Sequence, residues 1–161
     1  MPEVRVQAEI AAPIEAVWSV YTDYTGWTEW AGVREVVLRR RGEPAPNGIG
    51  ASCVLRARGV AIEEEIIGFE PPRRLRYRLV AGLPFRSYEG EVVLSELGEN
   101  TRLSWQVRFE PRVIGTGGWM ARLLRSELEQ TLERLVTYPF EKRLDAPPLD
   151  DSTLRDRSLR R

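Results

Sequence analysis

The chain opens with a strand pattern that gives way to a helix pattern at a proline, and few small folds begin in this order. Between residues 3 and 10, apolar and polar residues alternate with period two, which is typical of a half-buried strand. Pro13 follows, and proline suits the first turn of a helix because its φ is fixed and no N–H is needed there. Apolar residues then recur at helical spacing, at Ile14, Val17, Trp18 and Tyr21.

Six strand-like runs follow a second short helical segment that carries Tyr24, Trp27 and Trp30. Turn-forming residues separate the runs, which span residues 33–41, 51–58, 61–69, 73–80, 86–96 and 101–110. In the last run Leu103, Trp105, Val107 and Phe109 share one face, and polar residues share the other. Because the strands are consecutive, the sequence predicts an antiparallel α+β domain of seven strands with one apolar face.

A long helix near the C-terminus is expected to cover that apolar face. Residues 119–144 have a helical pattern after Gly117 and Gly118, and Pro139 predicts a kink or an end near residues 137–138. The inward stripe of this helix contains Leu124, Leu128, Thr131 and Leu135. We therefore expect one domain over residues 1–144. The segment 145–161 has no packing pattern and is expected to be a disordered tail.

Composition excludes several classes of function. The 24 basic and 24 acidic side chains cancel and are interleaved, so we expect no nucleic-acid partner. No apolar run reaches the ~20 residues of a membrane span, and no signal peptide opens the chain, so we expect a cytoplasmic protein without stable membrane insertion. The chain has no histidine, which excludes a histidine base and histidine-ligated metals. The single cysteine, Cys53, cannot build a thiolate zinc site and is expected in the core, so we predict neither a metal nor a cofactor.

This arrangement resembles the helix-grip fold of the START-like superfamily, also known as SRPBCC, and within it the polyketide cyclase/dehydrase branch. The resemblance covers residues 3–142. It rests on residues 10–18, IAAPIEAVW, on Tyr21–Tyr24 and Trp27–Trp30, on residues 69–75, FEPPRRL, and on the final helix. It implies a curved sheet wrapped around that helix, two short helices after the first strand, and an internal cavity for an apolar ligand. Members of this superfamily span carriers, receptors, cyclases and chaperone activators, so the fold implies no single activity.

Strand phase selects the side chains that face the final helix, and these either form a solid core or line the cavity. Core packing is the more common role of such residues. Tyr77, Tyr88 and the indoles of Trp105 and Trp119 are stronger candidates, because a buried polar tip needs a partner. The predicted ligand-binding residues are Trp30, Leu55, Glu64, Tyr77, Tyr88, Trp105, Phe109, Trp119, Leu124 and Leu128, with Leu135 on the same inward stripe.

Residues 61–67, AIEEEII, contain a conflict of phase. Inward-facing isoleucines at positions 62 and 66 bring Glu64 inward, whereas inward-facing residues at positions 67 and 69 bring Glu63 and Glu65 inward. Either phase directs at least one carboxylate toward the apolar side of the sheet.

The preceding run favours the phase in which Glu64 is the lone inward acid. Its residues 53, 55 and 57 are apolar, which leaves Arg56 and Arg58 outside to meet Glu63 and Glu65. Burial would raise the pKa of Glu64 and make it a candidate acid/base or a hydrogen-bonding anchor. A bulge, a position at a wet cavity mouth, or an arginine partner are the alternatives.

Three functions remain open from the sequence. The first is binding of a hydrophobic small molecule, such as a lipid, a quinone or a polyketide-like ring, in the internal cavity. The second is a polyketide cyclase or dehydratase in which Glu64 and a tyrosine act as acid and base. The third is an interaction module with a filled cavity, in which Trp27 and Trp30 form an exposed partner surface. The sequence leaves the oligomeric state open.

Overall fold

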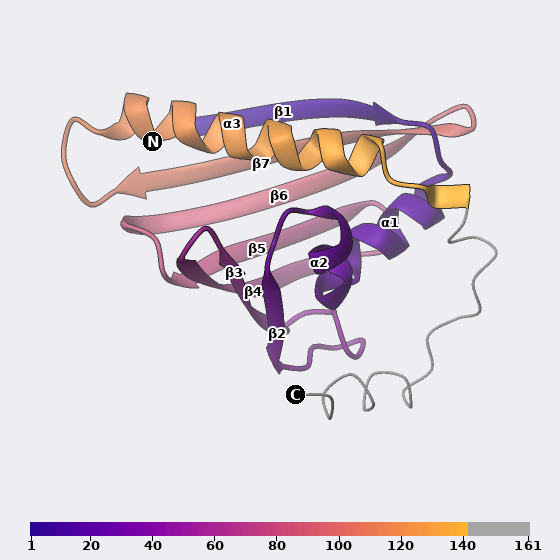
Figure 1. Ribbon diagram of the computed structural model, residues 1–161, viewed down its shortest axis with the longest axis horizontal. Helices are drawn as coiled ribbons and strands as arrows, with labels where there is room; N and C mark the ends of the chain where they lie inside the picture. Colours follow the sequence, from indigo (N-terminus) through magenta and orange to yellow (C-terminus); the bar gives the residue numbers. More distant parts are fainter. Residues whose placement is uncertain (142–161) are drawn as a thin grey trace.

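The computed structural model describes residues 1–141, which form a seven-stranded sheet and three α-helices (Figure 1). The predicted tail, 145–161, and the last residues of the predicted domain, 142–144, lie outside the described residues. The elements are β1 Glu3–Ile10, α1 Ile14–Thr22, the 3-10 turn η1 Tyr24–Gly26, α2 Trp27–Trp30, β2 Glu35–Arg40, β3 Ser52–Ala57, β4 Val60–Glu70, β5 Arg74–Ala81, β6 Phe85–Leu97, β7 Asn100–Pro111 and α3 Gly117–Val136.

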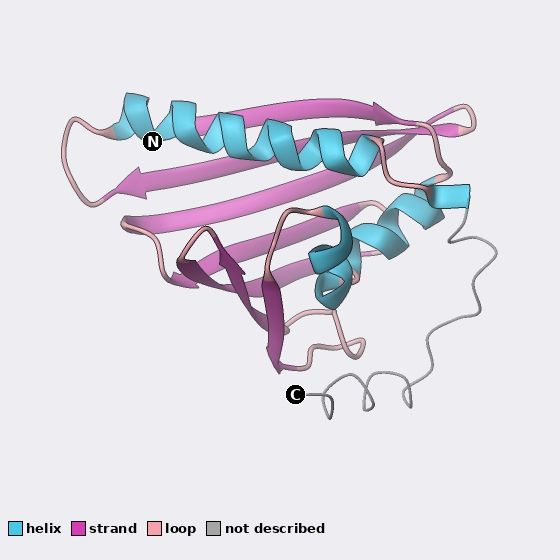
Figure 2. Ribbon diagram, viewed as in Figure 1, coloured by secondary structure: helices cyan, strands magenta, loops and turns pink. Residues whose placement is uncertain are grey.

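The sheet is antiparallel throughout, with the strand order β1-β7-β6-β5-β4-β3-β2. Helix α3 packs along β1 and β7, and the three α-helices lie on one face of the sheet (Figure 2). The predicted α+β helix-grip architecture, with two short helices after the first strand and a long C-terminal helix, is confirmed.

Two prolines mark helix boundaries as the sequence predicts. The carbonyl oxygen of Pro13 accepts from the N–H groups of Ala16 and Val17, at 3.0 and 3.1 Å, and these bonds start α1. Helix α3 ends at Val136, three residues before Pro139, whose ring and missing N–H are incompatible with a further helical turn.

The two faces of the sheet differ in chemistry, because side chains alternate along each strand. On the inner face, Leu103, Trp105, Val107 and Phe109 of β7 are buried. On the outer face, arginines and glutamates of neighbouring strands form ion pairs, such as Arg74 with Glu91 at 2.8 Å. Exposed pairs of this kind stabilise a fold weakly, so burial of the inner face against the helices provides most of the stability.

Helix α3 offers a matched test of that burial. Leu135 is fully buried, whereas Leu123 is 49 % exposed on the same helix. Leu135→Ala should lower the free energy of unfolding by about 2–5 kcal/mol, because it removes buried methyl groups and leaves a cavity. Leu123→Ala should change it by less than about 0.5 kcal/mol. Chemical denaturation measures both values, and equal effects would contradict the assigned face of α3.

Candidate functional site

A partly enclosed cavity of about 160 Å³ lies between the sheet, helix α3 and the short N-terminal helices. Its walls come from α1, η1, α2, from strands β3 to β7 and from α3, so segments far apart in the sequence meet around it. The lining is mostly aromatic and aliphatic. It consists of Tyr21, Tyr24, Trp27, Cys53, Leu55, Ile62, Glu64, Ile66, Leu75, Tyr77, Tyr88, Trp105, Leu128 and Thr131.

Strand β4 brings Glu64 into this lining, and a bulge explains the conflict of phase in residues 61–67. Ile66 pairs with Tyr77 and Gly68 pairs with Arg76, so Ile67 is an extra residue on β4. Such an insertion shifts the side-chain phase by one residue. Residues 62, 64 and 66 therefore line the cavity before the bulge, and Phe69 packs on the core after it.

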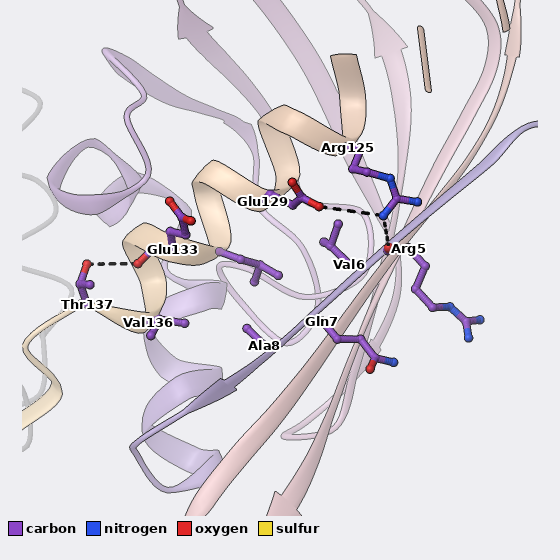
Figure 3. Close-up of a pocket in the computed structure, with 10 residues that line it drawn as sticks. Arg5, Val6, Gln7, Ala8, Arg125, Glu129, Glu133, Val136 and Thr137 are labelled. Carbon is purple, nitrogen blue, oxygen red and sulfur yellow. Dashed lines mark hydrogen bonds and ion pairs between the residues drawn. The ribbon is translucent and has the colours of Figure 1, made fainter. Parts of the chain in front are cut away.

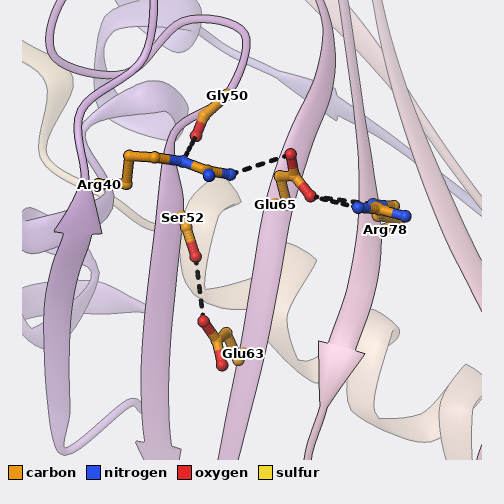
Figure 4. A network of polar contacts seen from close by, with 6 residues as sticks. All are labelled: Arg40, Gly50, Ser52, Glu63, Glu65 and Arg78. Carbon is orange, nitrogen blue, oxygen red and sulfur yellow. Dashed lines mark hydrogen bonds and ion pairs between the residues drawn. The ribbon is translucent and has the colours of Figure 1, made fainter.

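The carboxylates on either side of Glu64 lie on the outer face, and Figure 4 shows Glu65 between Arg40 and Arg78 and Glu63 beside Ser52. Glu65 accepts hydrogen bonds from Arg78 at 2.7 Å and from Arg40 at 3.1 Å. Glu63 accepts from the Ser52 hydroxyl at 3.3 Å and pairs with Arg39 at 3.4 Å.

The predicted arginine partners of these two glutamates were wrong. Arg56 pairs with Glu35 at 3.5 Å. Arg58 reaches α3, where it binds Glu127 and donates to Gln130 at 3.3 Å. The register of the hairpin explains these partners. Glu63 and Glu65 pair with Val54 and Ser52, whereas Arg58 lies in the turn at the tip of the β3–β4 hairpin.

Glu64 makes no hydrogen bond or ion pair with any of residues 1–141, in contrast to its two neighbours. Burial in the apolar cavity wall raises the pKa of its carboxyl from 4.5 to about 7, because ionisation there loses hydration without gaining a partner. The group is therefore present in both protonation states near neutral pH, and it can donate or accept a proton.

A pair of hydrogen-bonded aromatic side chains faces Glu64 from β5 and β7. The indole N–H of Trp105 donates to the Tyr77 hydroxyl at 2.9 Å. The Tyr77 ring occupies the space above Gly90 on β6, where a Cβ atom would overlap the ring. Tyr88 lies beside Tyr77, with ring centroids 6.3 Å apart. Burial is the main cause that raises the pKa of both tyrosines, so both hydroxyls remain protonated and can donate to a ligand.

The N-terminal helices supply the opposite wall through side chains that are already hydrogen-bonded. The Tyr24 hydroxyl donates to the Asn47 carbonyl at 3.0 Å, and the Trp27 indole donates to the Tyr21 carbonyl at 2.8 Å. Cys53 also lines the cavity, and burial followed by the charge of Glu64 raises the pKa of its thiol to about 12. A thiol with this pKa is a poor nucleophile at neutral pH.

Six of the ten predicted ligand-binding residues lie in the cavity lining. They are Leu55, Glu64, Tyr77, Tyr88, Trp105 and Leu128. Whether they bind a ligand stays a prediction.

The other four lie elsewhere. Trp119 is 63 % exposed, because it precedes Leu128 by nine residues, which is two and a half helical turns, and so lies on the opposite face of α3. Leu124 is half-buried and packs on the core, as does the fully buried Leu135 of the same stripe. Phe109 packs on the Phe85 ring at 5.1 Å, and Trp30 packs on Trp27 at the same distance.

Several lining residues are absent from the predicted ligand-binding set, although the phase of their strand or helix places them on the inner side. Cys53 and Ile62 share the inward phase of Leu55 and Glu64, and Thr131 lies on the predicted stripe of α3. Tyr21, Tyr24 and Trp27 carried no such signal, because their place in the wall depends on how the short helices fold over the sheet.

A larger hollow of about 840 Å³ lies outside the sheet, between the free edge of β1 and helix α3 (Figure 3). It is an open groove whose walls carry charged side chains, among them Arg125 and Glu129, 4.0 Å apart. Arg125 also donates to the Arg5 carbonyl at 3.1 Å, which occupies part of the free strand edge. We take the smaller cavity as the candidate functional site, because it is partly enclosed, aromatic and contains a carboxyl without a partner among residues 1–141.

Within 1–141, no helix is both long and apolar enough to span a membrane. The same part of the chain has no group of three or more histidine, cysteine or acidic side chains placed to hold a metal ion.

Comparison with known proteins gives one family and one fold. The family model described as polyketide cyclase/dehydrase and lipid transport matches residues 1–138. A START superfamily protein from Mycobacterium smegmatis superimposes with a TM-score of 0.74 at 18 % identity, over 84 % of this chain and 95 % of its own. XoxI from Bacillus cereus gives 0.71 at 19 % identity, over 90 % and 97 %.

A third similar structure is DynU16, a protein of the dynemicin biosynthetic locus. It superimposes with a TM-score of 0.68 at 24 % identity, over 86 % of this chain and 47 % of its own. At these identities the superpositions show a common fold. No curated protein matches the chain significantly.

The raised pKa of Glu64 predicts an unusual dependence of stability on pH. The folded protein favours the neutral acid, so its stabilising effect is complete below pH 4.5 and is lost as pH rises to about 7. Relative to Glu64→Gln, the wild type should lose about 3 kcal/mol of unfolding free energy over that range. Denaturant titrations at several pH values measure this difference.

Glu65→Gln is the matched control, since hydrogen bonding to Arg78 lowers the pKa of Glu65. Its effect has the opposite sign, because Glu65 stabilises the fold above its unfolded pKa and loses that effect as pH falls. If the wild type and Glu64→Gln differ by the same amount at every pH, Glu64 is not buried as described.

Proposed function

Because this chain belongs to the polyketide cyclase/dehydrase and lipid transport family, we propose that it binds a small hydrophobic molecule in the cavity between its sheet and helix α3. The observation that supports this most strongly is the lining itself. It is partly enclosed and rich in aromatic side chains, with one carboxyl that has no partner among residues 1–141. Sites for small molecules typically combine such apolar walls with a few convergent polar groups.

The cavity volume limits the ligand. A protein cavity of roughly 150 Å³ holds one benzene molecule, and ligand pockets for drug-sized molecules span roughly 300–1,000 Å³. At about 160 Å³, this cavity accommodates one ring, or the ring-sized end of a longer molecule. A whole lipid or a multi-ring polyketide would need the walls to move apart.

The contact between the β3–β4 hairpin and helix α3 is the natural place for such a movement. Leu55 and Ile62 line the cavity from the hairpin, and Leu128 and Thr131 line it from the helix. Near the hairpin tip the two elements are joined by the exposed ion pair of Arg58 with Glu127. An exposed pair contributes little free energy, so its loss would open this side at small cost.

The polar groups in the wall orient the ligand in the cavity. Glu64 is without a partner among residues 1–141, and the buried hydroxyls of Tyr77 and Tyr88 remain protonated. A ligand with one polar end therefore gains hydrogen bonds at this side, and its apolar part contacts Ile66, Leu75 and Leu128.

A second candidate function is supported by the same carboxyl. A group with a pKa of about 7 is matched to proton transfer at neutral pH, and a cyclase or dehydratase needs such an acid/base. Under this alternative Glu64 moves the proton and Tyr77 or Tyr88 stabilises the developing charge on a substrate oxygen. Glu64→Gln should then abolish turnover of a bound polyketide-like substrate, whereas a carrier would retain most of its binding.

The alternative of an interaction module required Trp27 and Trp30 to be exposed. Trp27 and Trp30 are buried, and their rings pack against each other at 5.1 Å. They therefore form no exposed partner surface, because α2 folds onto the core rather than away from it.

Filling the cavity tests the proposed function. Leu55→Trp should place an indole in the cavity and abolish binding of ring-sized hydrophobic molecules, because the site is too small for both. Arg56→Trp adds the same side chain at the neighbouring exposed position and should leave binding unchanged. Native mass spectrometry of freshly purified proteins, followed by toluene titration, measures the difference. Equal binding by both variants would exclude this cavity as the site.

A further inference from the structure

We propose that the ligand of this cavity is an organic amine, bound as its ammonium ion, with Glu64 as its counter-ion and the surrounding rings as its cage. This inference rests on the proposed function and specifies its ligand class. It follows from three features of the wall: the isolated negative charge, the absence of a cationic side chain, and the number of aromatic faces.

Among residues 1–141, the cavity lining contains one acidic side chain and no basic one. None of the arginines of residues 1–141 is among the lining residues. Three arginines of β2 and β5 bind Glu63 or Glu65 on the outer face, namely Arg39, Arg40 and Arg78. Glu64 is thus held apart from the cations that neutralise its neighbours, and none of residues 1–141 places a cation in the cavity.

The groups that face Glu64 are all neutral near pH 7. They are Tyr21 of α1, Tyr24 of η1, Cys53 of β3, Tyr77 of β5 and Tyr88 of β6, and burial raises the pKa of each. Helix α3 adds only Leu128 and Thr131. None of these groups can compensate an ionised Glu64 by carrying a positive charge, so its pairing with a ligand cation meets no competitor within this wall.

The aromatic content suits an ammonium ion. Ring faces carry negative potential, and several of them around one site bind ammonium groups more strongly when water is excluded. Tyr21 lies between Trp27 and Trp105, with ring centroids 5.2 and 5.8 Å away. Tyr77 and Tyr88 extend this set from the neighbouring strands. Six lining residues are aromatic: Tyr21, Tyr24, Trp27, Tyr77, Tyr88 and Trp105.

A neutral alcohol uses fewer of these features than an amine does. It can accept or donate one hydrogen bond at Glu64, but it neither compensates the carboxylate nor attracts the ring faces. An ammonium does both, and it converts the costly unpaired carboxylate into a buried ion pair. Because half of the Glu64 population is protonated near pH 7, binding of an ammonium must release a proton to solvent.

Three probes of one size test the inference: benzylamine, benzyl alcohol and toluene. The Kd of benzylamine should rise about tenfold for each pH unit below about 7, because only the ionised Glu64 binds it. The Kd values of benzyl alcohol and toluene should not rise. Calorimetry in two buffers of different ionisation enthalpy, one pH unit below the pKa of Glu64, should show close to one proton released per benzylamine and none for the other two probes.

Two variants localise the effect. Glu64→Gln should weaken benzylamine binding above pH 7 by about tenfold or more, with toluene binding within about twofold of wild type. Glu65→Gln, on the outer face of the same strand, should leave all three affinities unchanged. The wild-type pH profile and proton release need no variant, so the inference stays testable even if Glu64→Gln folds poorly.

The outcomes separate this inference from the proposed function. If toluene or benzyl alcohol binds but benzylamine binds no more tightly and releases no proton, the amine is excluded and hydrophobic binding stands. If Glu65→Gln weakens benzylamine as much as Glu64→Gln does, the counter-ion is not Glu64 and the inference fails. If none of the three probes binds the wild type, both the inference and the proposed function are overturned.

Discussion

Strand β4 changes its side-chain phase at Ile67, and the character of the inner sheet surface depends on this bulge. Before it, Ile62, Glu64 and Ile66 face the cavity, and after it Phe69 packs on Trp18, with ring centroids 5.3 Å apart. A strand without the extra residue could satisfy only one half of this pattern. If residues 67 and 69 set the phase, Glu63 and Glu65 would enter the cavity and lose their arginines. The bulge therefore lets one strand combine two apolar contacts with a single isolated acid.

The neighbouring strands are built around the same feature. Gly90 leaves the space that the Tyr77 ring fills, and Trp105 fixes the Tyr77 hydroxyl with a hydrogen bond at 2.9 Å. On the other face of β4, Arg78 and Arg40 hold Glu65. One strand thus has Glu63 and Glu65 engaged on its outer face, whereas Glu64 on its inner face has no partner among residues 1–141. Since exposed ion pairs contribute little free energy, the arginines matter more for keeping their partners on the outer face than for overall stability.

The architecture could be predicted from sequence because local signals agreed with each other. Alternation in β6 and β7, Pro13 at the start of α1 and Pro139 after α3 each reported on their own segment, and the consecutive strands fixed the topology. The phase of β3 also placed Glu64 on the inner side. These signals depend only on neighbours along the chain or on the adjacent strand.

What could not be predicted depends on tertiary packing. The bulge at Ile67 leaves no mark in the sequence beyond an apparent conflict, and the wall formed by Tyr21, Tyr24 and Trp27 depends on how short helices fold across the sheet. Trp119 was misplaced for a simpler reason, since its aromatic character outweighed its helical phase. The size of the cavity could not be predicted either, because it is the small difference between the volume enclosed by the backbone elements and the volume of the side chains that fill this space.

That size and the isolated acid together argue for a functional rather than a structural role of the cavity. A filled core would be more stable, and an aliphatic residue at position 64 would remove the cost of burying a carboxyl without a partner. The neighbouring hydroxyls have other partners: Tyr24 donates to the Asn47 carbonyl, and Tyr77 accepts from Trp105 and is hydrogen-bonded to Tyr88. The adjacent Glu63 and Glu65 are paired with arginines, and the fold gains nothing in stability from leaving Glu64 without such a partner among residues 1–141. The free energy forgone at Glu64 is recovered only when something with a complementary polar group enters the cavity, and burying that group there makes the interaction stronger than it would be at the surface.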